Sequence, residues 1–128
     1  MTTALTENIK VTVHSRYQKM YSNPLENNYV FSYHIVIENQ SDYAVQLLRR
    51  HWYIYDADGT RREVEGEGVI GEQPIISMGC KYEYVSGCNL RSGIGKMFGY
   101  YTMQRVADEV QIQIEIPEFS MFFPPLLN

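Results

Sequence analysis

Alternation of apolar and polar residues with a period of two is the feature that most constrains how this chain can fold. In the clearest stretch, residues 110–116, four β-branched apolar residues alternate with three polar ones. The same alternation recurs over residues 9–17 and 29–37. Successive side chains of a β-strand point to opposite faces, so each stretch predicts a strand with one buried face. We expect Pro117 to end the last of these strands.

The rest of the chain continues this pattern in short segments separated by turn-forming residues. Further strands are expected at residues 45–54, 61–64, 81–85 and 97–105. The Asp-Ala-Asp-Gly sequence at 56–59 predicts a hairpin turn, because Gly59 can adopt a positive φ. Between Leu47 and Trp52 the apolar positions change parity, which predicts a β-bulge near Leu48 to His51.

About seven short antiparallel strands without a helical period are typical of an all-β protein. The pattern favours an immunoglobulin-like or fibronectin type III-like antiparallel β-sandwich, with a small closed barrel as the alternative. Eleven Tyr and five Phe suit such half-buried sheet surfaces. Neither linkers nor repeats interrupt residues 1–128, so we expect a single domain. Trp52, the only tryptophan, lies in register with Ile54 and is expected in the core.

Charge and cysteine content restrict the compartment and the partners. A net charge of -4 and a pI near 5.3 argue against nucleic acid as a partner, since such domains usually display a basic excess. No apolar run reaches the ~18 to 20 residues that a membrane span needs, and the first residues do not resemble a signal peptide. We therefore expect a cytoplasmic protein without a membrane contact. Cys80 and Cys88 are too far apart along one strand and its turn to form a disulfide, so both should be reduced.

The most conspicuous motif is a literal G-x-G-x-x-G formed by Gly66, Gly68 and Gly71. In dinucleotide-binding folds these glycines join a strand to a helix whose amino end holds a pyrophosphate. No helical pattern follows here, and the loop itself contains acidic residues, so positive φ in a β loop is the structural interpretation. The competing interpretation is an anion or pyrophosphate site, to which Arg49 and Arg62, together with Arg50 and Arg61, would contribute.

Catalytic groupings are sparse in the sequence. It contains no G-x-S-x-G, no cysteine pair at metal-ligand spacing and no H-E-x-x-H, which predicts a protein that is not an enzyme and needs no cofactor. His51 is expected to be structural. His14 and His34 occupy outward positions on the first two long strands, where a hairpin centred near residue 24 would place them opposite each other as candidate metal ligands.

Apolar residues dominate the C-terminal segment around Pro124 and Pro125. They are Phe119, Met121, Phe122, Phe123, Leu126 and Leu127. The segment is expected either to lie against the sandwich and cover a sheet edge or to expose an apolar contact for a partner.

Five segments of the sequence are informative when they are taken together: residues 45–52, 64–74, 84–88, 99–103 and 116–119. In order and spacing these segments resemble the ApaG family. The similarity covers about residues 8–127. It implies a fibronectin type III-like sandwich and a link to cobalt and magnesium handling. It also implies a proposed pyrophosphate-binding role for the G-x-G-x-x-G, which corresponds to Gly66, Gly68 and Gly71 here.

Three functions remain in competition on this basis. The first is a non-catalytic β-sandwich module that binds an unidentified protein partner. The second is a nucleotide or pyrophosphate sensor that uses the glycine-rich loop at 66–71 and the neighbouring arginines. The third is an ion-linked protein that uses His14 and His34.

Overall fold

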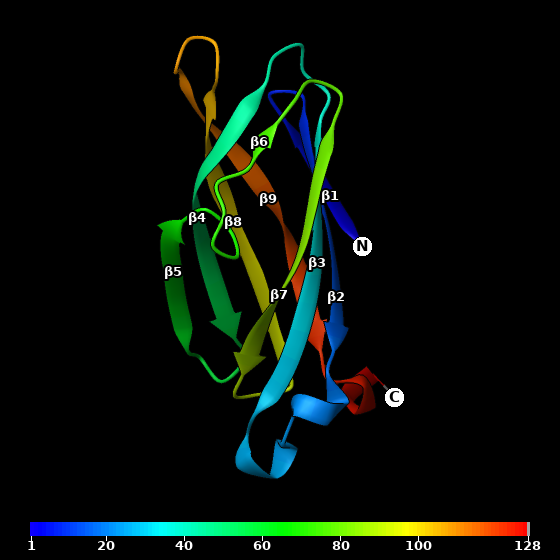
Figure 1. Cartoon of the computed structure of the whole chain (residues 1–128). Coiled ribbons are helices and arrows are strands. Elements are labelled where there is room, and N and C mark those ends of the chain that lie inside the picture. Colours follow the sequence, from blue (N-terminus) through cyan, green and yellow to red (C-terminus); the bar gives the residue numbers. More distant parts are fainter. Residues whose placement is uncertain (128) are drawn as a thin grey trace.

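A computed structural model describes residues 1–127, and the chain folds as two antiparallel sheets packed face to face (Figure 1). The first sheet has the order β1-β2-β3-β7. Its strands are β1 (Thr2–Thr6), β2 (Ile9–Tyr17), β3 (Tyr29–Asn39) and β7 (Lys81–Leu90). The second sheet has the order β5-β4-β8-β9, and β6 also pairs with β4. Its strands are β4 (Val45–Asp56), β5 (Arg61–Glu67), β6 (Ile75–Ile76), β8 (Ile94–Arg105) and β9 (Gln111–Phe122).

The sandwich prediction is confirmed, whereas the strand count and one strand end differ from expectation. The described residues form nine strands, two more than expected. The additional strands are β1 and the two-residue β6, which the sequence did not predict because neither shows a clear alternation. The prediction that Pro117 ends its strand is wrong, since β9 continues to Phe122. Pro117 lies where the register between β8 and β9 shifts, between the pairs Gly99 with Ile116 and Met97 with Phe119. A bulge on an edge strand tolerates a residue without an N–H group.

Local features that the sequence predicted are present. The register between β4 and β8 shifts between Leu47 and Arg49, which confirms the β-bulge. The hairpin turn closes through a hydrogen bond of 2.9 Å from the Asp56 N–H to the Thr60 carbonyl, and Gly59 has a φ of +94°. Trp52 is buried, with 2% of its surface exposed, among apolar side chains of both sheets. Short 3-10 helices at Lys19–Tyr21, Pro24–Glu26 and Pro124–Leu127 complete the described chain, and none of its helices is long and apolar enough to cross a membrane.

The two long sides of the sandwich differ. On one side β9 contacts both β1 and β2, and Ser15 donates a side-chain hydrogen bond of 3.0 Å to the Ser120 carbonyl. On the other side the edge strands β5 and β7 are not paired with each other. The C-terminal segment lies on the side where β9 contacts β2. Phe119 and Met121 are buried there, and Phe123 packs on Tyr17. The side chains of Leu126 and Leu127 lie outside the described part of the chain.

Candidate functional site

The glycine-rich loop is folded tightly against the bulge of β4, but the expectation that Gly66 belongs to this loop is wrong, since Gly66 lies in strand β5 and pairs with Arg50. Gly68 N–H donates to the Leu48 carbonyl at 2.8 Å, and Val69 and Glu72 exchange two backbone hydrogen bonds of 2.8 and 2.9 Å. Gly68 and Gly71 have φ values of +61° and +80°, which confirms the expectation of positive φ in the loop. The N–H groups of Gly68, Val69 and Glu72 are thus used within the chain, so they already serve the local backbone geometry.

The arginines that the sequence grouped around this loop lie on two different faces. Arg50 and Arg62 line one cleft of about 200 Å³ between the open edges of the two sheets, together with Ser86. Arg50 donates from Nη1 to the carbonyls of Glu67 and Gly68 at 3.0 and 2.9 Å. Arg49 is exposed, and by alternation along β4 it shares a face with His51 instead.

Arg62 connects the two sheets across this cleft. Its Nη2 donates to the Asn89 carbonyl at 2.5 Å and lies 3.6 Å from the Cys88 sulfur. Burial raises the pKa of the Cys88 thiol, while the Arg62 charge acts in the opposite direction. Burial likewise raises the pKa of the neighbouring Tyr33 hydroxyl. The cleft therefore presents cations and protonated groups, not an activated nucleophile.

The two candidate metal-binding histidines are paired as the sequence predicted. The register of β2 and β3 places His14 directly opposite His34, and both line a surface hollow of about 270 Å³. His34 Nε2 lies 2.8 Å from a carboxylate oxygen of Glu83 on β7. Within residues 1–127 no group of three or more His, Cys, Asp or Glu side chains is placed to hold a metal ion. Cys80 and Cys88 are both free thiols.

A feature that we did not expect from the sequence lies on the outer face of the second sheet. Five partly exposed rings form a continuous chain there, which we call the aromatic face: His51, Tyr53 and Tyr55 of β4, and Phe98 and Tyr100 of β8. Their ring centroids are about 5 Å apart, from 4.8 Å for His51 and Tyr53 to 5.2 Å for Tyr53 and Phe98. His51 and Tyr100 stack at 5.0 Å with planes 14° apart.

His51 is fixed within this face by two carboxylates of the edge strand β5. Its Nε2 lies 3.0 Å from Glu63 and its Nδ1 lies 3.1 Å from Glu65. Only 15% of the His51 side chain is exposed, whereas both glutamates are more than half exposed. The expectation of a structural histidine agrees with this geometry, since both ring nitrogens have partners.

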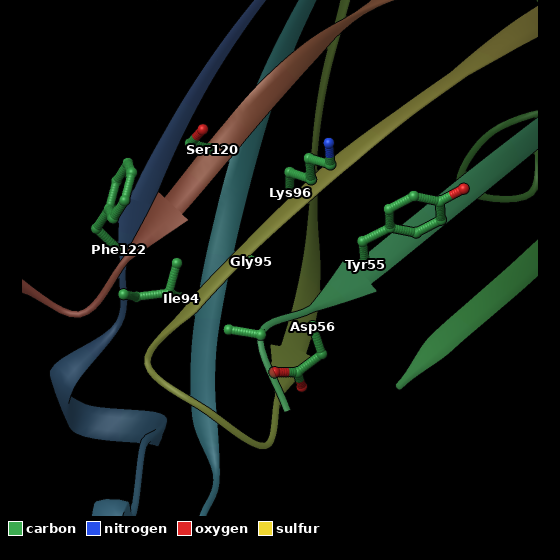
Figure 2. A pocket seen from close by; sticks show the side chains of 8 residues that line it. Tyr55, Asp56, Ile94, Gly95, Lys96, Ser120 and Phe122 are labelled. Atoms are coloured by element: carbon green, nitrogen blue, oxygen red, sulfur yellow. The ribbon is translucent and has the colours of Figure 1, made fainter. Parts of the chain in front are cut away.

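A shallow hollow of about 320 Å³ extends the aromatic face toward one end of the sheet. Figure 2 shows it between the ends of β4 and β9 and the start of β8, with Tyr55, Lys96 and Phe122 around it. Its apolar lining includes Ile94 and Phe122, which are 40% and 42% exposed. An apolar side chain of a bound molecule could be buried here next to the rings.

The sequence contained a signal for this face, although the ring contacts themselves were hidden. Rings at alternate positions 51, 53 and 55 indicate one face of a strand, and so do those at 98 and 100. Because Trp52 and Ile54 fill the inner face, these rings must lie on the outer one. Nothing in the sequence fixes which strands are neighbours, so the contact between the two groups of rings could not be inferred.

Comparison with known proteins gives a consistent family match. A family model described as the ApaG domain matches residues 19–105. Protein ApaG of Brucella suis biovar 1 is 46% identical over 124 residues, which covers 97% of this chain and 95% of that protein. Protein ApaG of Sinorhizobium fredii is 46% identical over 125 residues, with 98% and 95% covered.

A solved structure agrees with the sequence comparison. A crystal structure from Bordetella pertussis, assigned as an ApaA protein, superposes with a TM-score of 0.87 at 36% identity and covers 91% of this chain and 94% of that one. Its sandwich is therefore similar to the present one along nearly the whole chain.

Proposed function

The chain belongs to the ApaG family, and on that premise we propose that it is a non-catalytic module that binds a protein partner through the aromatic face. The observation that supports this proposal is the continuous chain of five partly exposed rings on an outer sheet surface. Contiguous apolar patches of this kind mark interaction sites, and aromatic residues are enriched at interfaces. A link to cobalt and magnesium handling, which so far only the resemblance implies, would then act through the partner.

Affinity purification from the native host with wild-type protein and with Tyr53→Ala tests this proposal. A partner that is recovered is identified, purified and titrated against both chains. We expect its affinity for Tyr53→Ala to be at least about tenfold lower than for the wild type, since buried interface aromatics contribute ~2 kcal/mol or more. Tyr21→Ala is the matched control, because Tyr21 is 71% exposed and lies in the 3-10 helix Lys19–Tyr21, which connects β2 and β3 of the other sheet. A partner that binds both variants equally would contradict the proposal.

A nucleotide or pyrophosphate sensor is the second candidate, and one observation favours it. Arg50 and Arg62 line the same cleft beside the glycine-rich loop, together with the Ser86 hydroxyl. Calorimetric titration with ATP and diadenosine tetraphosphate separates the two functions. Saturable binding that Arg62→Ala abolishes would favour the sensor, and the same titration with Co²⁺ on wild type and His34→Ala tests the ion-linked alternative.

A further inference from the structure

Acidic side chains flank the aromatic face on both sides. Three glutamates lie along β5 and two along β9: Glu63, Glu65, Glu67, Glu115 and Glu118. The register places Glu63 opposite Tyr53, Glu65 opposite His51, and Glu115 opposite Tyr100. The basic residues on the same surface stand at its ends, with Arg61 and Lys96 near Tyr55 and Arg49 beyond His51. The middle of the face is therefore aromatic with an acidic border.

One end of the face already has cations packed on a ring. The Arg61 guanidinium carbon lies 4.8 Å from the Tyr55 ring centroid, and Lys96 Nζ lies 5.5 Å from it. Both distances fall within the ~6 Å range of a cation–π contact. The rings of Tyr53 and Phe98 stack on each other one row further along, beside Glu63. A cation placed over that row would meet both a ring face and a carboxylate.

The spacing of the rows sets the pattern that a bound chain would need. The cross-strand pairs Tyr53 with Phe98 and His51 with Tyr100 are two residues apart on each strand, which is ~7 Å. Alternate side chains of an extended segment lie at the same spacing. The hollow beside Tyr55, with Ile94 in its lining, is one further row away and is apolar.

We propose that the aromatic face binds an extended, basic segment of a protein partner, with arginine side chains at alternate positions over the two ring rows and an apolar side chain in the hollow. This inference rests on the proposed function and specifies the chemistry of the partner. A polyanion does not fit the middle of this surface, because Glu63, Glu65, Glu67 and Glu115 border it and would repel phosphates, while the fifth carboxylate, Glu118, pairs with Lys96.

Two synthetic peptides and their neutral analogues test this pattern. One peptide has a leucine followed at alternate positions by two arginines, and the other has the reverse order, since the direction of the bound segment is open. In the analogues citrulline replaces arginine, which removes the charge and keeps the shape. We expect saturable binding of at least one arginine peptide in calorimetry, weakened about tenfold or more by citrulline and weakened further by added salt.

Protein variants locate the peptide on the surface. Phe98→Ala and the double change Glu63→Gln with Glu65→Gln should each reduce the affinity about tenfold. Glu83→Gln is the matched control, because Glu83 also pairs with a histidine, His34, but on the outer face of the other sheet. Thermal melts of each variant establish that it is folded before titration.

The outcomes separate this inference from the proposed function. Equal binding of arginine and citrulline peptides, no saturable binding of either orientation, or unchanged binding by Phe98→Ala would overturn the inference. A native partner whose binding needs Tyr53 but whose contact segment is not basic would refute the inference and leave the proposed function intact. Peptide binding without any Tyr53-dependent partner would instead refute the proposed function.

Discussion

At the scale of single residues, backbone geometry accounts for the glycine-rich motif more fully than ligand binding does. A Cβ atom on Gly68 would lie 2.0 Å from the Glu72 carbonyl oxygen, which is a backbone clash. A Cβ on Gly71 would meet open space but would sit at φ +80°. A Cβ on Gly66 would contact only the flexible guanidinium end of Arg50, at 3.3 Å.

Alanine substitutions in the loop should therefore follow the order of strain. We expect Gly68→Ala to reduce the free energy of unfolding by more than ~2 kcal/mol, Gly71→Ala by ~1 kcal/mol and Gly66→Ala by less than ~0.5 kcal/mol. Urea denaturation with and without ATP measures this. If all three variants kept wild-type stability but lost stabilisation by ATP, the loop would be a phosphate site and the structural interpretation would be wrong.

Loss of the Trp52 side chain should create a large cavity in the core, because this bulky residue is almost completely buried. It contacts Tyr33 and Phe119 of the two sheets at ring-centroid distances of 5.3 and 6.0 Å. Trp52→Ala should cost ~3 to 5 kcal/mol of stability in equilibrium unfolding. A cost below ~1 kcal/mol would contradict the core position of Trp52 and place it at the surface instead. Trp52→Phe, which keeps most of the apolar contacts, should cost markedly less.

At the scale of elements, the sequence predicted most strands from the alternation that one buried face imposes on their residues. It predicted β5, which has no buried residue, from the hairpin turn that precedes it. It missed β1, whose residues alternate between intermediate and exposed, and β6, which is too short to show a period. Of the candidate site, the pairing of His14 with His34 followed from one hairpin. The meeting of Arg50 with Arg62, and of Tyr53 with Phe98, depends on sheet order, which a local pattern does not encode.

Two buried hydroxyls join the sheets in the core, and their titration should make stability depend on pH. Tyr84 of β7 and Tyr101 of β8 share a hydrogen bond of 2.5 Å. Burial is the main cause that raises the pKa of both hydroxyls above the ordinary tyrosine value. The unfolded chain therefore loses these protons first as the pH rises. The stabilisation is complete below pH ~10 and is lost progressively above it.

Urea midpoints between neutral and strongly alkaline pH measure this dependence. The double variant Tyr84→Phe with Tyr101→Phe removes both members of the hydrogen bond, so we expect little change at neutral pH. Above pH ~10 its stability should fall less steeply than that of the wild type, by up to ~1.4 kcal/mol per pH unit for each tyrosine. Tyr21→Phe, at an exposed position, should follow the wild-type curve. An identical alkaline slope in the double variant would contradict the assignment.

At the scale of the whole molecule, the two long sides of the sandwich differ. On the closed side β9 contacts β1 and β2, whereas on the open side the edge strands β5 and β7 are not paired with each other. Side-chain hydrogen bonds and packing join β9 to β1 and β2, including a bond of 3.2 Å from Glu115 N–H to the Thr6 hydroxyl. On the open side Arg62 donates across the gap from β5 to β7. The residues of β5 are exposed or intermediate along its whole length, so this strand contributes little buried surface to either layer.

This asymmetry predicts that β5 opens before the rest of the molecule. Amide hydrogen exchange followed by NMR should show faster exchange for the β5 amides bonded to β4 than for those of β9 bonded to β8, because fewer buried contacts hold β5 in place. Arg62→Ala removes the bond to Asn89 and should accelerate the β5 amides about fivefold to tenfold, which corresponds to a loss of ~1 to 1.4 kcal/mol. Arg91→Ala is the control, since Arg91 is largely exposed and pairs only loosely with Asp58 at 3.8 Å. Equal acceleration in β5 and β9 would mean that Arg62 stabilises the whole fold, and the open side would then not be a separate unit of opening.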